Sequence, residues 1–213
     1  MHVQHMRPTP ATTPTSTTAA DVAQPATAPA LHLVTSTTTA AVRAAGGRHR
    51  CTRPRTLHLV DLENLLAGRV DAASVAEVWA EYQQVTGMRP GDHVVVAVAA
   101  RHATATFFSL PGAVQRVVGA DIPDGADLAL LDTVDLAWTA RRFGQVMIAT
   151  GDHAFTGVAA HLHTQGVPVV QVIGGGWPST GLYLQCSTQL YLTAAQRRVQ
   201  DRRRSEIAAA LAA

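Results

Sequence analysis

Short runs of aliphatic and β-branched residues alternate with longer segments of helical periodicity throughout residues 56–192. This alternation is typical of α/β domains, in which helices cover both faces of a mainly parallel sheet. The expected strands are Leu57–Asp61, His93–Ala99, Val114–Gly119, Val146–Thr150 and Pro168–Ile173. The sequence therefore predicts an α/β domain with a three-layer, Rossmann-like α/β/α architecture.

Helical segments are expected between these strands and at the end of the chain. Ser74 and Glu77 have the spacing of a capping box, in which each side chain bonds a free backbone N–H at the start of a helix. Apolar residues at helical intervals follow until Gly87. The expected helices run from Ser74 to Gly87, from Gly125 to about Arg142, from Asp152 to Gly166 and over Thr193–Ala213.

The first 50 residues have a composition unlike the rest of the chain. Ala, Thr, Pro and Ser fill 29 of these positions, and Phe, Trp and Tyr are absent. Burial of such small side chains does not offset the roughly 1–2 kcal/mol of backbone entropy lost per ordered residue. We therefore expect a disordered tail over 1–55, the α/β domain over 56–192 and an Arg- and Ala-rich helix over 193–213.

Charge is distributed unevenly along the chain. Residues 1–55 carry six Arg and one acidic residue, residues 56–192 six Arg and twelve acidic residues, and residues 193–213 five Arg and two acidic residues. An acidic domain between basic arms fits a cation-using site flanked by segments that bind a polyanion. It fits equally a domain whose arms are simply kept solvated by their charges, so charge alone leaves both interpretations open.

Cysteine usage and hydropathy predict a cytoplasmic protein. Cys51 and Cys186 form no CxxC or Cys/His pattern, so neither a disulfide framework nor a zinc site is expected. No apolar run reaches the roughly 18 residues needed to cross a bilayer, and the first residues lack the apolar core of a secretion signal. A membrane partner is therefore not expected.

Aspartates follow two of the expected strands, at the edge of the sheet where ligands of open parallel sheets bind. Asp61 ends the first strand, and Asp152 follows the strand that ends at Thr150. A third, Asp127, lies near the start of a helix and shares a face with Leu130 and Val134 at 100° per residue. Asp127 therefore points toward the sheet, unless it only provides a negative charge at the helix N-terminus.

Three carboxylates at one sheet edge repel one another, and the arrangement is stable only if a cation binds or a proton is shared. Oxygen ligands of this kind suit Mg²⁺ or Mn²⁺. The sequence therefore predicts a hard-metal site, with three acids supporting one metal more readily than two.

Three motifs in chain order resemble the NYN-domain group of the PIN-like nuclease superfamily. They are an apolar strand that leads into Asp61-Leu-Glu-Asn64, a helix start Gly125-Ala-Asp127, and a strand that leads into Thr150-Gly-Asp152. The resemblance covers residues 56–192 and implies a PIN-like fold and metal-dependent cleavage of RNA. It also implies that Asp61, Asp127 and Asp152 are the catalytic, metal-binding carboxylates and that Asn64 is their polar catalytic partner.

The chain departs from the family pattern at several positions. Ala154 replaces a second aspartate, Thr133 stands where the family often has an aspartate, with Asp132 one place early, and Asp124 stands where a basic residue is common. A catalytically weak or inactive RNA-binding module is therefore one alternative. A small-phosphate hydrolase is another, although the Asp-x-Asp of such phosphatases and a Gly-rich phosphate loop are missing.

Further residues have candidate supporting roles. The Thr150 hydroxyl could orient Asp152, and His153 could act as a base or a phosphate donor, or simply be an exposed histidine. Trp177 follows three glycines and could stack on an unpaired base, while Arg141 and Arg142 could contact phosphates. These residues also suit a flexible turn and a solvated surface. The sequence leaves the RNA target and the oligomeric state open.

Overall fold

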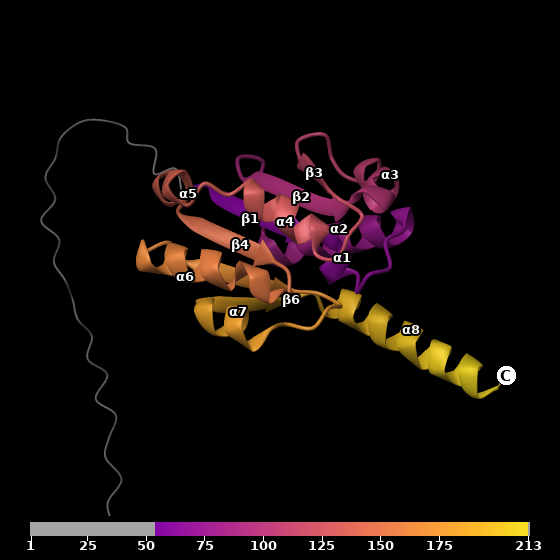
Figure 1. Ribbon diagram of the computed structural model, residues 1–213. Coiled ribbons are helices and arrows are strands. Elements are labelled where there is room, and N and C mark those ends of the chain that lie inside the picture. Colours follow the sequence, from indigo (N-terminus) through magenta and orange to yellow (C-terminus); the bar gives the residue numbers. More distant parts are fainter. Residues whose placement is uncertain (1–53, 213) are drawn as a thin grey trace, which may run out of the picture. The chain divides into compact units, whose positions relative to one another are not determined.

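The structure, a computed structural model, describes residues 54–212 (Figure 1). Its six strands are β1 (Thr56–Asp61), β2 (His93–Ala99), β3 (Gln115–Gly119), β4 (Gln145–Ala149), β5 (Val169–Ile173) and β6 (Thr188–Tyr191). All neighbouring strands pair in parallel, in the order β3-β2-β1-β4-β5-β6. The predicted α/β class and mainly parallel sheet are confirmed.

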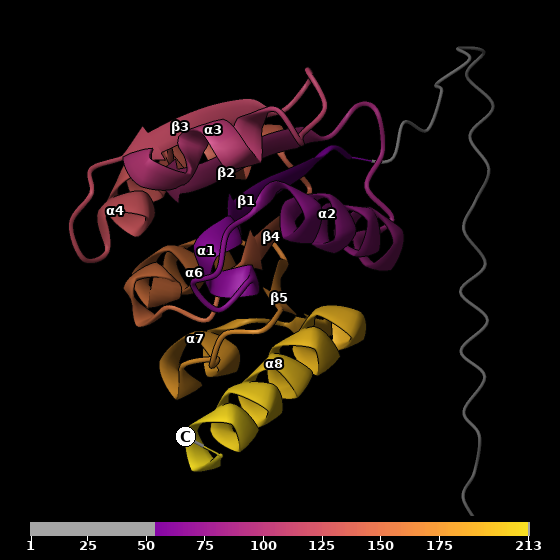
Figure 2. The same cartoon turned by 90° about the vertical axis from the view of Figure 1, so that its right-hand side faces the viewer.

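Helices cover both faces of this sheet (Figure 2). They are α1 (Leu62–Leu65), α2 (Ala72–Thr86), α3 (Ala103–Phe107), α4 (Gly125–Asp132), α5 (Leu136–Arg142), α6 (Thr156–Thr164), α7 (Thr180–Gln185) and α8 (Thr193–Leu211). One apolar cluster packs residues of α1, α2 and α8 against the sheet, and a second packs residues of α4, α6 and α7 against the opposite face. The predicted three-layer architecture is therefore confirmed.

The buried strands explain why the apolar runs in the sequence are continuous. Leu57 and Leu59 of β1 belong to one apolar cluster, whereas Val60 belongs to the other. Successive side chains of a strand point to opposite faces, so a strand covered on both sides is apolar at most of its positions. All residues of β1 are buried, including its last residue, Asp61.

The order of the strands reverses between β1 and β4. The chain moves outward from β1 through β2 to β3 and then returns to β4 on the other side of β1. Val60 pairs with Ala149, so the two central strands end side by side. Because their crossover connections leave in opposite directions, the carboxyl ends of β1 and β4 form the crevice in which ligands of such sheets bind.

Two helix predictions were wrong in detail. Helix α2 begins at Ala72, two residues before Ser74, because Asp71 is its N-cap and accepts from the Ser74 backbone N–H at 3.0 Å. The single helix expected from Gly125 to Arg142 is two helices, α4 and α5. Asp135 accepts from the Trp138 N–H at 2.8 Å, which starts α5 as a separate helix.

The final segments were not fully anticipated. Helix α7 and strand β6 had no counterpart among the expected elements, whereas α8 occupies the predicted C-terminal segment. Both carboxylate oxygens of Glu81 in α2 accept backbone N–H groups of α8, from Ala194 at 2.7 Å and Ala195 at 2.9 Å. The first turns of α8 are thus fixed to the domain, and the rest of the helix projects beyond the sheet (Figure 1).

Most of the predicted tail lies outside the described residues, which include only Pro54 and Arg55 of it. The Arg55 guanidinium lies 5.7 Å from the ring centroid of Phe143. The Arg55 carbonyl accepts from the Gly144 N–H at 3.0 Å. Among the helices of residues 54–212, each is too short or too polar to cross a membrane.

Candidate metal centre

Asp61 is held rigidly at the carboxyl end of β1. Its Oδ1 accepts from the Asn64 N–H at 3.1 Å, which caps α1, and its Oδ2 accepts from the Thr150 hydroxyl at 2.9 Å. The carboxylate is buried. These two bonds fix the orientation of Asp61 and tie the end of β1 to the end of β4.

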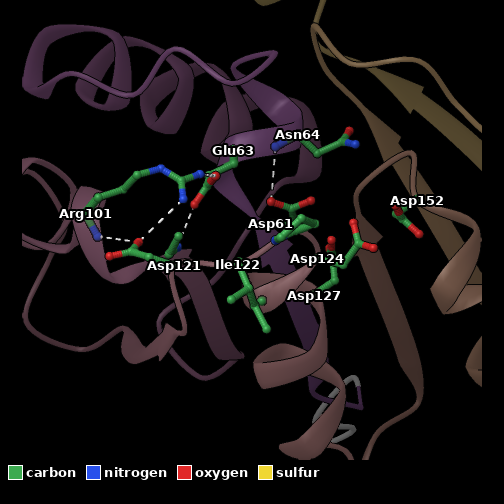
Figure 3. A pocket seen from close by; sticks show the side chains of 13 residues that line it. Asp61, Glu63, Asn64, Arg101, Asp121, Ile122, Asp124, Asp127 and Asp152 are labelled. Atoms are coloured by element: carbon green, nitrogen blue, oxygen red, sulfur yellow. Dashed lines mark hydrogen bonds and ion pairs between the residues drawn. The ribbon is translucent and has the colours of Figure 1, made fainter.

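Asp127 in the first turn of α4 is the central carboxylate. Its residue is only 9% exposed, and its Oδ1 has no hydrogen-bond partner among residues 54–212. Ligand oxygens of Asp124, Asp127 and Asp152 all lie within 4.8 Å of one another. Figure 3 shows Asp61 beside this group, with its carboxylate bonded to Asn64. Four carboxylates from three separate segments therefore converge at the crevice.

Electrostatic repulsion and burial work against charge on these groups. Burial, followed by the charges of Asp61 and Asp152, raises the pKa of Asp127 to about 8. Burial also raises the pKa of Asp61, against the opposing effect of its bonds from Asn64 and Thr150. The two carboxyls are close enough to share a hydrogen bond once either is protonated. The group thus needs protons or a cation to persist.

Neighbouring acids at the same edge are neutralised differently. Arg101 lies 2.9 Å from Glu63 Oε2 and 3.5 Å from Asp121 Oδ1. By contrast, no arginine forms an ion pair with Asp61, Asp124 or Asp127 in the part of the chain that the structure describes. The central acids therefore have no arginine partner among these residues, so a bound proton or a divalent cation must offset their repulsion.

The carboxylates line a surface pocket of about 520 Å³. Its central part is acidic, and Arg101 with its two acidic partners forms one side (Figure 3). The lining residues include Asp61, Glu63, Asn64, Arg101, Asp121, Ile122, Asp124, Asp127 and Asp152. A pocket of this size can hold a ligand next to the carboxylates.

Asn64 and Thr150 hold Asp61 and the loop after β4 in place through hydrogen bonds. Asn64 Oδ1 accepts from the Gly151 N–H at 2.9 Å, so its amide is committed to the loop after β4. Thr150 Oγ1 donates to Asp61 and accepts from the Asp152 N–H at 3.1 Å. The expected link between Thr150 and Asp152 therefore runs through the Asp152 backbone. The same hydroxyl also orients Asp61.

Replacing Thr150 with valine is expected to weaken Mn²⁺ binding about 10- to 100-fold, the usual cost of losing a residue that orients a ligand. Valine keeps the shape but removes the bond to Asp61 Oδ2. Mn²⁺ titrations followed by calorimetry should show this loss as a higher Kd. Thr164→Val at the end of α6 is the matched control, because that hydroxyl only bonds the His161 carbonyl. Equal Mn²⁺ affinities for both variants would contradict the role of Thr150.

Asp152 and His153 lie in the turn after β4. Asp152 Oδ1 accepts from the Ala154 N–H at 2.7 Å and lies 3.2 Å from His153 Nδ1. The His153 side chain is exposed, so it reaches solvent beside a cluster carboxylate. Ala154, which stands where the NYN pattern that the sequence resembles has an acid, contributes its backbone N–H to this turn and no side-chain ligand.

The predicted RNA contacts lie at opposite edges of the sheet. Arg141 and Arg142 are exposed in the last turn of α5, just before β4 begins. That position is the amino edge, whereas the carboxylates lie at the carboxyl edge, because a crossover helix runs antiparallel to its strands. Trp177 follows β5 and lies at the carboxyl edge. The structure thus brings Trp177 near the site and separates both arginines from it.

The start of helix α4 packs closely against Gly119 at the end of β3. An added Cβ at Gly119, the last residue of β3, would lie 2.2 Å from the Gly125 carbonyl oxygen. Gly119→Ala is therefore expected to displace the start of α4, lower the unfolding free energy by about 1–3 kcal/mol and reduce metal affinity. Calorimetry and Mn²⁺ titration of this variant should be compared with Gly112→Ala, where an added Cβ meets nothing within 4 Å. Wild-type metal affinity in Gly119→Ala would contradict this.

Sequence reasoning missed two residues of the site. Asp124 was noted only as a departure from the family pattern, yet it lies with Asp127 and Asp152. It has a left-handed backbone (φ 57°) before Gly125. The signal in the sequence was the Asp124-Gly125 pair, which is typical of turns. Gln171 is buried in β5 and donates to the Thr150 carbonyl at 3.0 Å. A polar residue within Val169–Ile173 was its signal.

Comparison with known proteins adds no relative to this description. No family model matches the sequence, and no curated protein matches it. Metal binding is therefore inferred from the carboxylates that converge at the crevice between β1 and β4.

Proposed function

We propose that the protein is a cytoplasmic, metal-dependent ribonuclease that hydrolyses phosphodiester bonds within RNA. The observation that supports it is the convergence of Asp124, Asp127 and Asp152 within 4.8 Å, beside Asp61. The lack of a pairing arginine for Asp61, Asp124 and Asp127 within residues 54–212 adds to it. The motifs that resemble the NYN group supply the choice of RNA as substrate.

The donor set suits Mg²⁺ or Mn²⁺. All four side chains offer carboxylate oxygens, which hard divalent cations prefer. Asp127 Oδ1 is buried without a partner in the described part of the chain, so it has a free lone pair where a cation would bind. Asp124, Asp127 and Asp152 would hold the ion, with Asp61 next to them. When bound, such an ion activates a water and neutralises charge that develops on the phosphate.

The protein's own residues supply orientation and substrate position. Thr150 and the Asn64 N–H fix Asp61, and the Ala154 N–H fixes Asp152, so the carboxylates keep their places during turnover. Arg101 lines one side of the pocket and carries a positive charge that is already shared between Glu63 and Asp121. An RNA phosphate that enters the pocket competes with these acids for the Arg101 guanidinium.

An RNA-binding module without turnover is the second candidate, and Ala154 is the residue that favours it. The family's second acid in this turn is absent. Asp124 offsets that loss, because it supplies a third carboxylate oxygen to the cluster from the other side of the crevice. The number of acids is therefore sufficient for one ion, which favours the active enzyme.

The test uses the full-length protein and a labelled single-stranded RNA. Cleavage is expected with Mg²⁺ or Mn²⁺ and should stop when a chelator is added. Asp61→Asn protein purified in parallel controls for contaminating nucleases and should be inactive. Cleavage by that variant, or cleavage in chelator, would refute the proposal. RNA binding without turnover would establish the binding module instead, and hydrolysis of p-nitrophenyl phosphate without RNA cleavage would establish a small-phosphate hydrolase.

A further inference from the structure

A second pocket adjoins the metal centre at the carboxyl edge of the sheet. It has a volume of about 230 Å³ and lies between the loop after β5, the end of β6 and one face of α8. Its lining includes Gly174, Gly175, Trp177, Tyr191, Gln196, Val199, Gln200 and Arg203. We call it the Trp177 pocket. Its volume is below the roughly 300–1,000 Å³ of sites for drug-sized ligands, so it suits one flat ring system.

The loop that carries Trp177 is in contact with the metal centre. Ser179 N–H donates to the Gly151 carbonyl at 2.7 Å, and an added Cβ at Gly151 would lie 2.2 Å from the Trp177 carbonyl oxygen. Gly151 directly precedes Asp152. The backbone of residues 177–179 therefore lies directly against the turn that leads into Asp152.

Glycines shape the floor of the Trp177 pocket. An added Cβ at Gly175 would lie 2.4 Å from Val199 Cγ2, and one at Gly174 would lie 2.7 Å from the Leu65 carbonyl oxygen. Gly175 N–H donates to that same Leu65 carbonyl at 2.8 Å. The glycines let the loop lie close against α1 and α8, so the space above Val199 stays open.

The walls of the pocket combine aromatic, amide and cationic groups. Trp177 is 78% exposed, and the Arg203 guanidinium lies 5.7 Å from its ring centroid. Gln196, Gln200 and Arg203 repeat at intervals of four and three residues, which places them on one face of α8. Their side chains offer amide donors and acceptors and a fixed positive charge. Tyr191 adds a second exposed ring.

We infer that the Trp177 pocket binds a nucleobase of single-stranded RNA, one step along the strand from the phosphate held at the metal centre. Trp177 stacks on the base, Gln196 and Gln200 bond its edge, and Arg203 meets an adjacent phosphate. Exposed aromatic rings beside basic side chains are how proteins hold unpaired bases. The inference rests on the proposed function for its choice of RNA as ligand, and it concerns a site separate from the carboxylates.

The experiment measures binding of a short, labelled single-stranded RNA to full-length protein with Ca²⁺ in place of the catalytic ion. Trp177→Ala is expected to weaken binding about tenfold or more, because one base loses its stacking partner. Trp177→Phe keeps an aromatic ring and should recover part of the affinity. Phe108→Ala is the matched control, since Phe108 is 91% exposed but lies before β3, at the other edge of the sheet. A double-stranded RNA of equal length should bind all four proteins alike.

Cleavage assays on the same variants separate the two proposals. If wild-type protein cleaves RNA and Trp177→Ala binds single strands as well as wild type, the base pocket is refuted and the ribonuclease stands. If no protein cleaves but Trp177→Ala alone loses single-strand affinity, the base pocket stands and the ribonuclease is refuted. Equal losses for Trp177→Ala and Phe108→Ala, or an equal loss on double-stranded RNA, would also refute a stacking site.

Discussion

Asp127→Asn is expected to abolish RNA cleavage while it makes the metal-free protein more stable near pH 8. The substitution removes a ligand charge from the centre of the cluster, where Asp124, Asp127 and Asp152 converge. Loss of several kcal/mol of charge stabilisation corresponds to at least roughly a thousandfold lower rate. A residue that serves function and destabilises the fold shows this combination: its replacement lowers activity and raises stability.

The direction of the stability change follows from the pKa of Asp127. Burial raises this pKa to about 8, above its ordinary value of 3.8. The raised pKa favours folding below pH 3.8, and that contribution is lost as the pH rises to 8, where the folded protein must hold a buried negative charge. Asparagine carries no charge at any pH. If Asp127→Asn raises the free energy of unfolding by about 2 kcal/mol at pH 8, Tm rises by roughly 4–8 °C.

Calorimetry of chelator-treated proteins at pH 4 and pH 8, with cleavage assays in Mn²⁺, tests both expectations. The Tm difference between Asp127→Asn and wild type should be large at pH 8 and vanish near pH 4. Asp132→Asn is the control, because Asp132 is an exposed acid on the same helix. An Asp127→Asn protein that cleaves RNA, or that unfolds below wild type at pH 8, would contradict the metal centre.

Acidification from pH 6.5 to 4 is expected to destabilise the protein by about 3 kcal/mol through His58, at 1.36 kcal/mol per pKa unit. His58 is buried in β1, with Nδ1 2.8 Å from the Tyr82 hydroxyl. Its Nε2 lies 3.7 Å from Asp92 Oδ2. Burial lowers the pKa of His58 from 6.5 to about 4, against the opposing effect of Asp92.

Because the pKa of His58 is lowered in the folded protein, the unfolded chain binds a proton between pH 6.5 and 4 that the folded protein does not bind. The stabilising contribution of neutral His58 is therefore present above pH 6.5 and is lost as the pH falls toward 4. Asp127 titrates in the same range with the opposite sign, so the two effects oppose each other in the wild-type protein. The Asp127→Asn background removes the contribution of Asp127. The raised pKa of Asp61 acts in the same direction as that of Asp127, but it is common to both proteins of the comparison below and cancels there.

Urea unfolding in the Asp127→Asn background, at pH 7 and at pH 4.5, measures this effect. The double change His58→Phe and Tyr82→Phe removes the hydrogen bond together with both of its partners, so that no polar group is left unpaired by it. This protein should lose much less free energy of unfolding on acidification than its parent. An equal loss in both proteins would show that His58 is not the acid-sensitive group.

The central architecture was accessible from the sequence because burial on both faces leaves a strong pattern. The β1, β2 and β4 segments are mostly apolar; Asp61 ends the first of them, and Asp152 follows the last by three residues. Strand β6, by contrast, is only partly buried and contains Thr188 and Gln189. With so few apolar positions, its four residues gave no distinct strand signal.

The spacing of apolar residues also failed to show that one helix ends and another begins between Asp132 and Leu136. The apolar spacing of Leu130, Leu131, Val134 and Trp138 continues across the gap between α4 and α5. The Asp135 side chain nevertheless caps a new helix there, and Trp138 is 45% exposed. A single capping hydrogen bond is a local event that helical periodicity does not record.

The sequence alone determined the parallel α/β sheet and the edge at which Asp61 and Asp152 lie, since both follow from apolar runs and the chain direction. Only the tertiary structure decided that Asp124 joins Asp127, that Arg101 neutralises Glu63 instead of Asp61, and that Arg141 lies at the far edge. The reason is physical. Periodicity reports how each residue is buried, whereas distances between charged side chains from different segments depend on how those segments pack.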